Sequence, residues 1–285
     1  MRLKINLLLA VALFAVSTSS IFARFLPNVS AIVIAFWRLA IASILLWIYT
    51  LSQKQPKLDK DHYKYYVLSG FFLALHFSAF YSAVKLTSIA NATLLGITAP
   101  VFTMLYERLF LKRTLKPIVF MGLVVAGVGT IIITGKGLIS SDGSILGQMF
   151  GLLAATCISI VYIFANRLRK DTDTIAYTKF LYTIGAVFLL IFTIGNENVL
   201  SITKIEFKWL VALGIIPTIL GHSIFYYSIK YTSPTIVASV PIGEPIIASI
   251  FAWFMFSEVI PLPTFIGGVF ILVGIYFLVV FSPRQ

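Results

Sequence analysis

Long apolar runs alternate with short polar segments along the whole chain. A helix needs about 20 apolar residues to cross roughly 30 Å of hydrocarbon, where its backbone N–H and C=O groups must bond one another. Ten runs fit that length: 5–23, 30–51, 65–85, 90–111, 117–135, 145–166, 175–194, 208–229, 234–256 and 262–281. The pattern therefore predicts an all-α membrane protein with ten transmembrane helices and no separate soluble domain.

The composition agrees with a chain surrounded by lipid. Of its 285 residues, 59% are hydrophobic and only 11% are charged, so a water-soluble fold would lack the polar side chains to cover its surface. A net charge of +12 would suggest nucleic acid in a soluble protein, because basic faces neutralise phosphates. Here the basic residues lie between the apolar runs, as topology signals do. We therefore expect the lipid bilayer, and no nucleic acid, as a partner.

The lysines and arginines predict the orientation. With the N-terminus in the cytoplasm, the cytoplasmic segments hold fifteen of them and the external segments five. Cytoplasmic loops are the ones enriched in these residues. Both termini are therefore predicted to be cytoplasmic, in a multi-pass protein of the cell (inner) membrane.

An internal repeat divides the chain. Residues 78–88 read SAFYSAVKLTS and residues 223–233 read SIFYYSIKYTS, and the same offset of 145 pairs Pro100 with Pro245 and Gly129 with Gly274. The pattern predicts two five-helix repeats, over 1–137 and 145–282. Because five is odd, the second copy must enter the membrane from the opposite side. Inverted repeats are typical of secondary transporters, which bind their substrate near the bilayer midplane.

The first apolar run has a second interpretation. Arg2 and Lys4 before it also fit a cleaved signal peptide. However, Ile21 stands where a cleavage site needs a small residue, and Ile21-Phe22-Ala23 recurs as Ile163-Phe164-Ala165 in the sixth run. We therefore expect the first helix to be retained.

Three motifs carry a family resemblance. The third predicted helix ends in Phe-Tyr-x-x-x-Lys-x-Thr-Ser, the fourth has Pro100 in mid-span, and the ninth reads Pro241-Ile-Gly-Glu244-Pro245 before Ser257-Glu258. This pattern resembles the EamA branch of the drug/metabolite transporter superfamily. The resemblance covers essentially the whole chain and implies a carrier. Members export amino acids or other metabolites, import metabolites such as S-adenosylmethionine, or carry sugar derivatives. One departure is Lys112-Arg113, where the family usually has an acid matching Glu258.

Glu244 is the sharpest candidate site residue. It lies about ten residues into the ninth span, where a carboxylate costs several kcal/mol unless it is paired, hydrated or protonated. Pro241 and Pro245 free backbone carbonyls beside it. One interpretation is a substrate-binding and proton-coupling group, with protons as the candidate coupling ion. The other is a structural acid that satisfies the broken helix.

Histidine and aromatic side chains complete the predicted substrate site. His76 shares a helical face with Phe80, although a core histidine bonded to a carbonyl is the alternative. Tyr81 and Tyr226 are repeat mates, but tyrosines near helix ends also form the interfacial belt. The predicted substrate-binding residues are His76, Tyr81, Thr98, Tyr162, Tyr226 and Glu244, with Ser19 as a further contributor. His222 is a weaker candidate.

Two basic residues, Arg38 and Lys179, fall within predicted spans. Arg38 could counter an anionic substrate, but we favour a side chain that extends to the membrane interface, and we expect the same of Lys179.

Cys157 is the only cysteine, so no internal disulfide can form. The sequence has no Gly-Lys-Ser/Thr loop, no Gly-x-Ser-x-Gly and no His-Glu-x-x-His motif. No enzyme, cofactor or metal site is therefore predicted.

Together these features predict a secondary transporter. It would move a small metabolite, an amino acid or related solute, by alternating access and in the direction of efflux. The first, third, fourth, sixth, eighth and ninth helices would line its cavity. One alternative is an importer of a nucleoside-type metabolite such as S-adenosylmethionine. Another is a non-carrier, either an enzyme acting on lipid-linked substrates or a flippase.

Overall fold

A computed structural model describes residues 2–53, 62–86, 95–96, 98–112, 116–139, 145–194, 199–257 and 262–281. Within these residues all regular structure is helical. The helices are α1 (Arg2–Arg24), α2 (Ala31–Thr50), α3 (Tyr63–Leu86), α5 (Thr98–Leu109), α6 (Pro117–Ile139), α7 (Ile145–Leu168), α8 (Thr174–Thr193), α9 (Lys204–Leu213), α10 (Ser223–Ile229), α11 (Pro234–Ser239), α12 (Glu244–Phe256) and α13 (Leu262–Phe281). A π-helical segment, η2 (Gly214–His222), joins α9 to α10, and a 3-10 turn, η3 (Val240–Gly243), joins α11 to α12.

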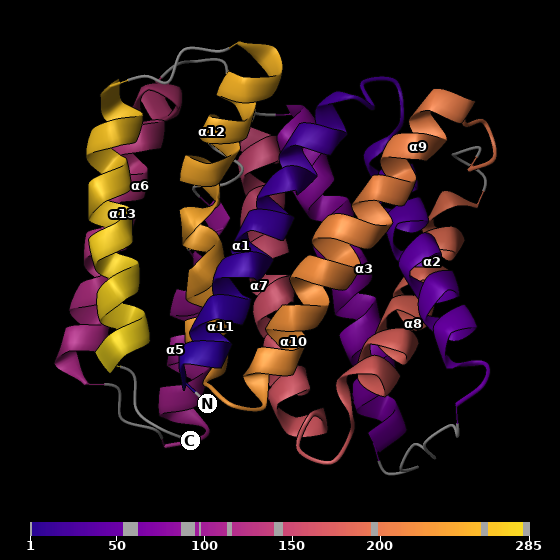
Figure 1. Ribbon diagram of the computed structural model, residues 1–285, viewed down its shortest axis with the longest axis horizontal. Coiled ribbons are helices and arrows are strands. Elements are labelled where there is room, and N and C mark those ends of the chain that lie inside the picture. Colours follow the sequence, from indigo (N-terminus) through magenta and orange to yellow (C-terminus); the bar gives the residue numbers. More distant parts are fainter. Residues whose placement is uncertain are drawn as a thin grey trace.

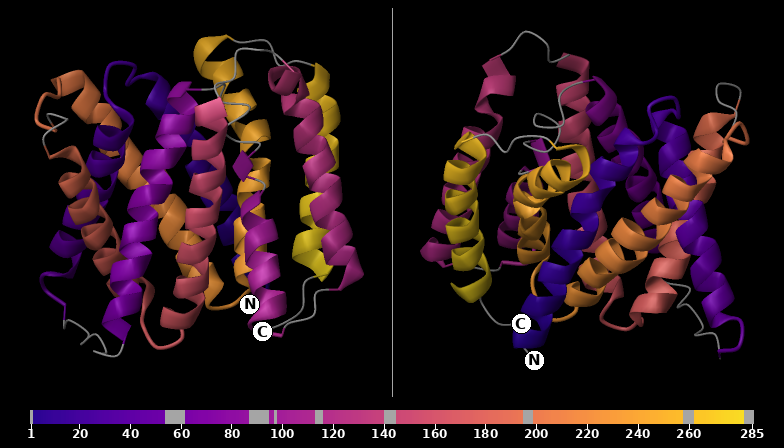
Figure 2. Two further views of the ribbon diagram at one scale, coloured as in Figure 1. Left: turned by 180° about the vertical axis from the view of Figure 1, so that it is seen from behind. Right: turned by 45° about the horizontal axis from the view of Figure 1, so that its top comes forward.

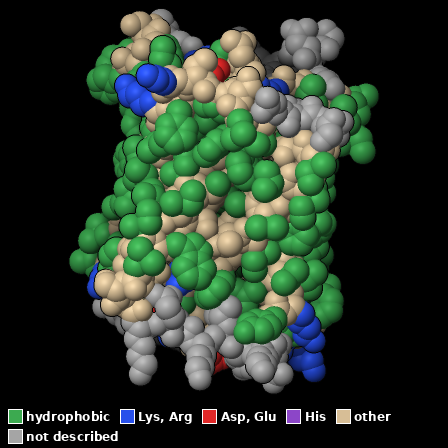
Figure 3. All heavy atoms as spheres, turned by 90° about the vertical axis from the view of Figure 1, so that its right-hand side faces the viewer, with side chains coloured by type: hydrophobic (Ala, Val, Ile, Leu, Met, Phe, Trp, Pro, Cys, Tyr) green, Lys and Arg blue, Asp and Glu red, His purple; other side chains and the backbone are tan. Residues whose placement is uncertain are grey.

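Many of these helices are long and apolar enough to cross a membrane. In the described part of the chain seven segments qualify: Leu3–Arg24, Ala31–Thr50, Tyr63–Leu86, Ile145–Leu168, Thr174–Thr193, Lys204–Ile229 and Pro234–Phe256. Two shorter apolar helices, Pro117–Ile132 and Phe265–Leu278, fall within α6 and α13. Figure 3 shows the outer surface of one side, with a broad apolar band between two ends where the Lys and Arg side chains gather. The expected all-α membrane architecture is confirmed at this level.

The helices form one bundle along a common direction. α1 begins and α13 ends at the same end of the bundle (Figure 1). α6 and α13 lie side by side at one flank in every view (Figure 2). A Cβ atom added to Gly129 would lie 2.5 Å from the carbonyl oxygen of Gly267, and one added to Gly274 would lie 2.5 Å from that of Gly122. The repeated glycines therefore let these two backbones touch.

The Lys-x-Thr-Ser sequence at residues 230–233 lies where one helix ends and the next begins. α10 ends at Ile229, and Ser233 is the N-cap of α11, accepting a hydrogen bond from the backbone N–H of Ile236 at 3.3 Å. Pro234 follows at the first helical position, where its missing N–H costs nothing. The corresponding Thr87 and Ser88 of the first repeat, like Arg113 and Glu258, lie outside the described residues.

Candidate functional site

A cavity lies in the middle of the bundle, beside the helix interruptions η2 and η3. It offers about 100 Å³ to the centres of water molecules, which is room for several waters or one small solute. All six helices that the sequence analysis expected contribute to its wall, and α2 adds Arg38. The lining is Val16, Ser19, Arg38, His76, Phe77, Phe80, Gly96, Ala99, Gly151, Ala154, Ala155, Ile158, Tyr162, His222, Phe225, Ala238, Pro241, Ile242 and Glu244.

Arg38 is held in this wall by three hydroxyl groups. Only 1% of the residue is exposed. Its Nε donates to Thr218 Oγ1 at 2.7 Å, and its Nη1 donates to Ser19 Oγ and to the Tyr81 hydroxyl, both at 2.9 Å. The guanidinium carbon lies 4.0 Å from the centroid of the Phe77 ring. Nη2 is buried and has no hydrogen-bond partner among the described residues.

The interpretation of Arg38 as a side chain that extends to the membrane interface is therefore wrong. Hydroxyl groups and an aromatic face replace water around the guanidinium, so the cation can stay inside. Lys179 is also buried, but near the end of α2, where its Nζ donates to Thr50 Oγ1 at 3.3 Å and lies 4.1 Å from the Trp47 ring centroid. It lies outside the cavity lining.

A π-helical segment places Thr218 against Arg38. Pro217 lacks an N–H inside the helix, and the backbone widens there into η2. Thr218 Oγ1 donates to the Leu213 carbonyl at 2.7 Å, so the same oxygen accepts from Arg38 and donates to the backbone. His222, the last residue of η2, faces the cavity.

The two histidines meet across the cavity. Their ring centroids lie 6.3 Å apart, although their positions are not related by the repeat. His76 Nδ1 bonds the Ala154 carbonyl at 2.8 Å, so His76 is both carbonyl-bonded and cavity-lining. His222 Nδ1 is buried without a hydrogen-bond partner among the described residues. The described residues contain no group of three His, Cys, Asp or Glu side chains that could hold a metal ion.

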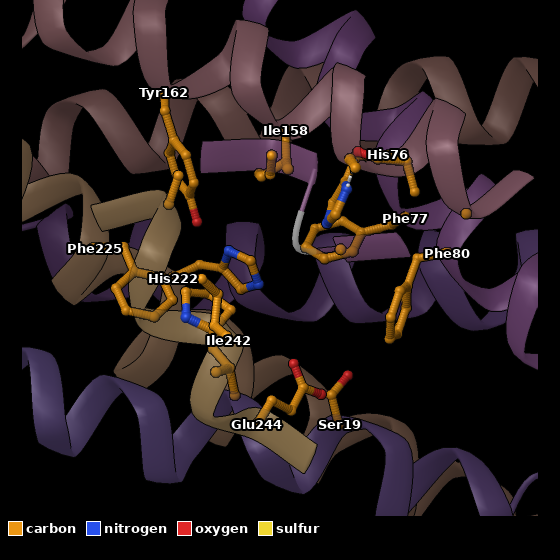
Figure 4. A pocket seen from close by; sticks show the side chains of 18 of the residues that line it. Ser19, His76, Phe77, Phe80, Ile158, Tyr162, His222, Phe225, Ile242 and Glu244 are labelled. Carbon is orange, nitrogen blue, oxygen red and sulfur yellow. Dashed lines mark hydrogen bonds between the residues drawn. The ribbon is translucent and has the colours of Figure 1, made fainter. Parts of the chain in front are cut away.

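Glu244 faces the same cavity from the start of α12. The 3-10 turn Val240–Gly243 interrupts the helix just before it. Its Oε1 is buried without a hydrogen-bond partner among the described residues, and within those residues it forms no ion pair with Arg38. Figure 4 shows its carboxyl, the two imidazoles and the Tyr162 hydroxyl directed into the space they enclose. The cavity is therefore lined by a guanidinium and a carboxyl group that form no ion pair with each other among the described residues.

The predicted site residues divide into three kinds. His76, Tyr162 and Glu244 line the cavity, as does Ser19. Tyr81 lies directly behind it and contacts it through hydrogen bonds to Arg38 and Ser19. Tyr226 is fully buried in a cluster of tyrosine rings, and Thr98 bonds the Leu95 carbonyl at 2.6 Å; neither is part of the lining.

One buried acid was missed from the sequence. Glu107 of α5 is 0% exposed and accepts a hydrogen bond from the Thr235 hydroxyl of α11. Glu107 lies eight positions after the cavity residue Ala99, about 12 Å along the helix. Glu107 lies four residues before the end of the predicted span 90–111, and nothing in the sequence indicated a role for it.

A second cavity lies on the other side of Tyr81. It offers about 270 Å³ and is lined by Ser20, Ala23, Arg24, Leu26, Pro27, Ile34, Tyr81, Val84 and Lys85. Lys85 Nζ donates to the Pro27 carbonyl at 3.1 Å, which fits its predicted place at a helix end. The Tyr81 ring thus lines this cavity while its hydroxyl bonds the wall of the central one.

Comparison with known proteins adds a family context. Residues 3–135 and 145–280 match the model of the EamA-like transporter family. An uncharacterized transporter of Archaeoglobus fulgidus is 25% identical over 97% of both chains. The pseudopaline exporter CntI of Pseudomonas aeruginosa is 26% identical over 85% of this chain and 83% of its own. A crystal structure with 17% identity covers 99% of this chain and 98% of that chain with a TM-score of 0.81, which shows a shared fold.

Proposed function

This chain belongs to the EamA-like transporter family, and we propose that it is a secondary carrier that moves a small metabolite across the inner membrane by alternating access. Membership makes it a multi-pass membrane transporter and not an enzyme. The substrate class we propose is an amino acid or a related solute. Efflux is the proposed direction, supported by the export function in the name of one relative, CntI.

The observation that carries the proposal is a cavity to which both halves of the chain contribute polar side chains. Ser19, Arg38 and His76 come from the first segment matched by the family model, and Tyr162 and Glu244 come from the second. When a site lies between two halves, rocking of one half against the other can expose it to either side of the membrane. A cavity within a single rigid half could not be exposed in this way.

The topology that we propose has ten transmembrane helices in two inverted repeats, over 1–137 and 145–282, with both termini cytoplasmic. Three features support it. The family model matches the chain twice, over 3–135 and 145–280. α1 begins and α13 ends at the same end of the bundle (Figure 1). The basic residues favour that end as the cytoplasmic one.

Two sets of contacts lie between the cavity and its surroundings, and we propose that they act as its gates. Toward the end where the chain begins, Glu107 and Thr235 join α5 to α11. On another side, the hydrogen bonds of Tyr81 with Ser19 and Arg38 lie between the central cavity and the second cavity. Alternating access would require these two contacts to break in turn.

Glu244 is the proposed proton-coupling group. Its Oε1 is buried without a hydrogen-bond partner among the described residues, so no hydrogen bond stabilises a negative charge on that atom. The other titratable or charged side chains in the lining are Arg38, His76, Tyr162 and His222. A proton gradient would then drive the solute by changing the charge of the site.

Transport by the purified protein in liposomes tests the proposal. The vesicles would be loaded with a mixture of amino acids and nucleoside-type metabolites, and solute movement would be measured with and without a pH difference. We expect at least one amino acid or related solute to move down its gradient and to respond to pH. If no solute moves under any pH difference, the chain is not a carrier of this kind.

Labelling of single cysteines tests the inverted topology. In a Cys157→Ser background, Lys85→Cys at the end of α3 and Lys230→Cys after α10 replace exposed side chains. A membrane-impermeant maleimide should reach Lys85→Cys from outside the cell and Lys230→Cys from the cytoplasm. Same-side labelling of the repeat-related pair would exclude the inverted arrangement.

A further inference from the structure

The second cavity has a one-sided charge. It lies where α1 and α3 end, at the end of the bundle opposite the one where the chain begins (Figure 1). Arg24 and Lys85 line it, and none of the described residues in its lining is acidic. Both side chains are exposed, so each can exchange water for a ligand. A concave site with charge of one sign concentrates counter-ions, so this cavity attracts anions.

The two cations do more than stabilise the ends of their own helices. Each lies in the last turn of its helix, where a positive charge is favourable. However, Lys85 Nζ crosses to the Pro27 carbonyl between α1 and α2, at 3.1 Å. The guanidinium carbon of Arg24 lies 5.0 Å from the centroid of the Phe256 ring of α12. Because both side chains are held against neighbouring segments, a ligand that binds them orders less side-chain motion.

We propose that the second cavity is a binding site for a small organic anion, separate from the central cavity. The anionic group would accept charge-assisted hydrogen bonds from Arg24 and Lys85. The apolar part of the ligand would pack on the rest of the wall, where burial of apolar surface is favourable. That wall includes Leu26, Ile34 and the ring of Tyr81. The two cavities share no lining residue, and this one, at about 270 Å³, is the larger.

Tyr81 connects this site to the proposed transport cycle. Its ring lines the second cavity, whereas its hydroxyl accepts from Arg38 and hydrogen-bonds with Ser19. An anion that packs on the ring binds the state in which these hydrogen bonds are intact, so it shifts the population toward that state. This step rests on the proposed function. It implies that the bound anion slows the carrier from outside the central cavity.

Three compounds of matched chemistry test the site. Benzoate has an anionic group and an apolar ring, benzamide is its neutral counterpart, and acetate has the charge without the ring. Binding to the purified full-length protein in an uncharged detergent would be measured by ligand-observed NMR, with empty micelles as the blank. We expect benzoate to bind at least about tenfold more tightly than either of the others.

Charge variants identify the cations that hold the anion. Arg24→Gln and Lys85→Gln should each weaken benzoate about tenfold and leave benzamide unchanged, since only benzoate carries the charge. Lys85→Arg keeps the cation and should retain benzoate. Lys208→Gln is the matched control. Lys208 is an exposed lysine on α9 that lies 5.1 Å from the Trp209 ring and outside the lining, so its loss should change neither affinity.

A lipid head group offers the same anionic chemistry, and nanodiscs distinguish the two sources. Benzoate should bind equally in nanodiscs of phosphatidylcholine and in nanodiscs that also contain a minor fraction of phosphatidylglycerol. Loss of benzoate binding in the second kind would assign the site to a lipid and overturn the proposal of a soluble ligand. Absence of benzoate binding to the wild-type protein in detergent, or equal binding of benzamide, would overturn the site itself.

Flux in liposomes tests the link through Tyr81. Benzoate on both sides of the vesicle membrane should lower solute flux by the wild-type protein, and Lys85→Gln should lose that sensitivity relative to its own flux without benzoate. Equal inhibition of both proteins would mean that benzoate acts in the central cavity, which would overturn the link. Vesicles that move no solute would contradict the carrier and leave the site standing, because its binding is measured without transport.

Discussion

Arg38 and Glu244 line the same cavity, yet their ionisable groups are held in opposite ways. Arg38 lies in the uninterrupted helix α2 and is fixed by hydroxyls from α1, α3 and η2. Glu244 lies where η3 meets α12 and has a carboxyl oxygen without a partner among the described residues. We therefore expect Arg38 to act as a permanent cation that hydroxyl groups hold in this conformation, and Glu244 to act as the group that changes its charge.

The largest expected effect comes from removing the fixed charge. Arg38→Ala should abolish transport in liposomes and lower the free energy of unfolding by about 2 kcal/mol, because Thr218, Ser19 and Tyr81 lose a common donor. Thermal unfolding in detergent would measure the second effect. Lys179→Ala is the matched control, since it removes a buried cation from outside the lining and should retain transport. Full transport by Arg38→Ala would mean that Arg38 only supports the fold.

The next effect concerns the adaptable charge. Glu244→Gln mimics the neutral acid, so we expect transport to continue at a reduced rate and to lose its dependence on pH. Glu206→Gln is the control, because this acid lies in an exposed capping box of α9 and should leave the pH profile unchanged. Measurement of solute flux at a series of pH values separates the two variants. An unchanged profile in Glu244→Gln would assign this residue to structure, and the contrast with Arg38 would then be lost.

The sequence singled out Glu244 as a site residue, but it led us to place the Arg38 side chain at the membrane interface. An acid in the middle of an apolar run stands out, because its cost can be judged from the run alone. The burial of Arg38 depends on Ser19, Tyr81 and Thr218, which lie on three other segments far apart in sequence. Helix positions could be predicted because each depends on the length of its own run. The side-chain contacts could not, because they depend on how the helices pack.

Equivalent positions in the two sequence repeats do not have equivalent hydrogen-bond partners. Tyr81 and Tyr226 are equivalent in sequence, and both are buried. The Tyr81 hydroxyl bonds Arg38 and Ser19, whereas the Tyr226 hydroxyl has no partner among the described residues. Arg38 has no basic counterpart at offsets of 142 to 145, the range seen in the repeat, where residues 180–183 read Phe-Leu-Tyr-Thr. Equivalent positions can thus face different chemistry.

The smallest expected effects come from this pair and test how rigidly Arg38 is held. Tyr81→Phe removes one acceptor from Arg38 and should lower the free energy of unfolding by about 1 kcal/mol. Tyr226→Phe removes a buried hydroxyl without a partner in the described residues, so it should leave stability unchanged or raise it slightly. Thermal unfolding of the two variants side by side gives the comparison, since each loses one oxygen atom. Equal losses would mean that the Tyr81 bond does not hold Arg38, and the cation would then be as free to adapt as Glu244.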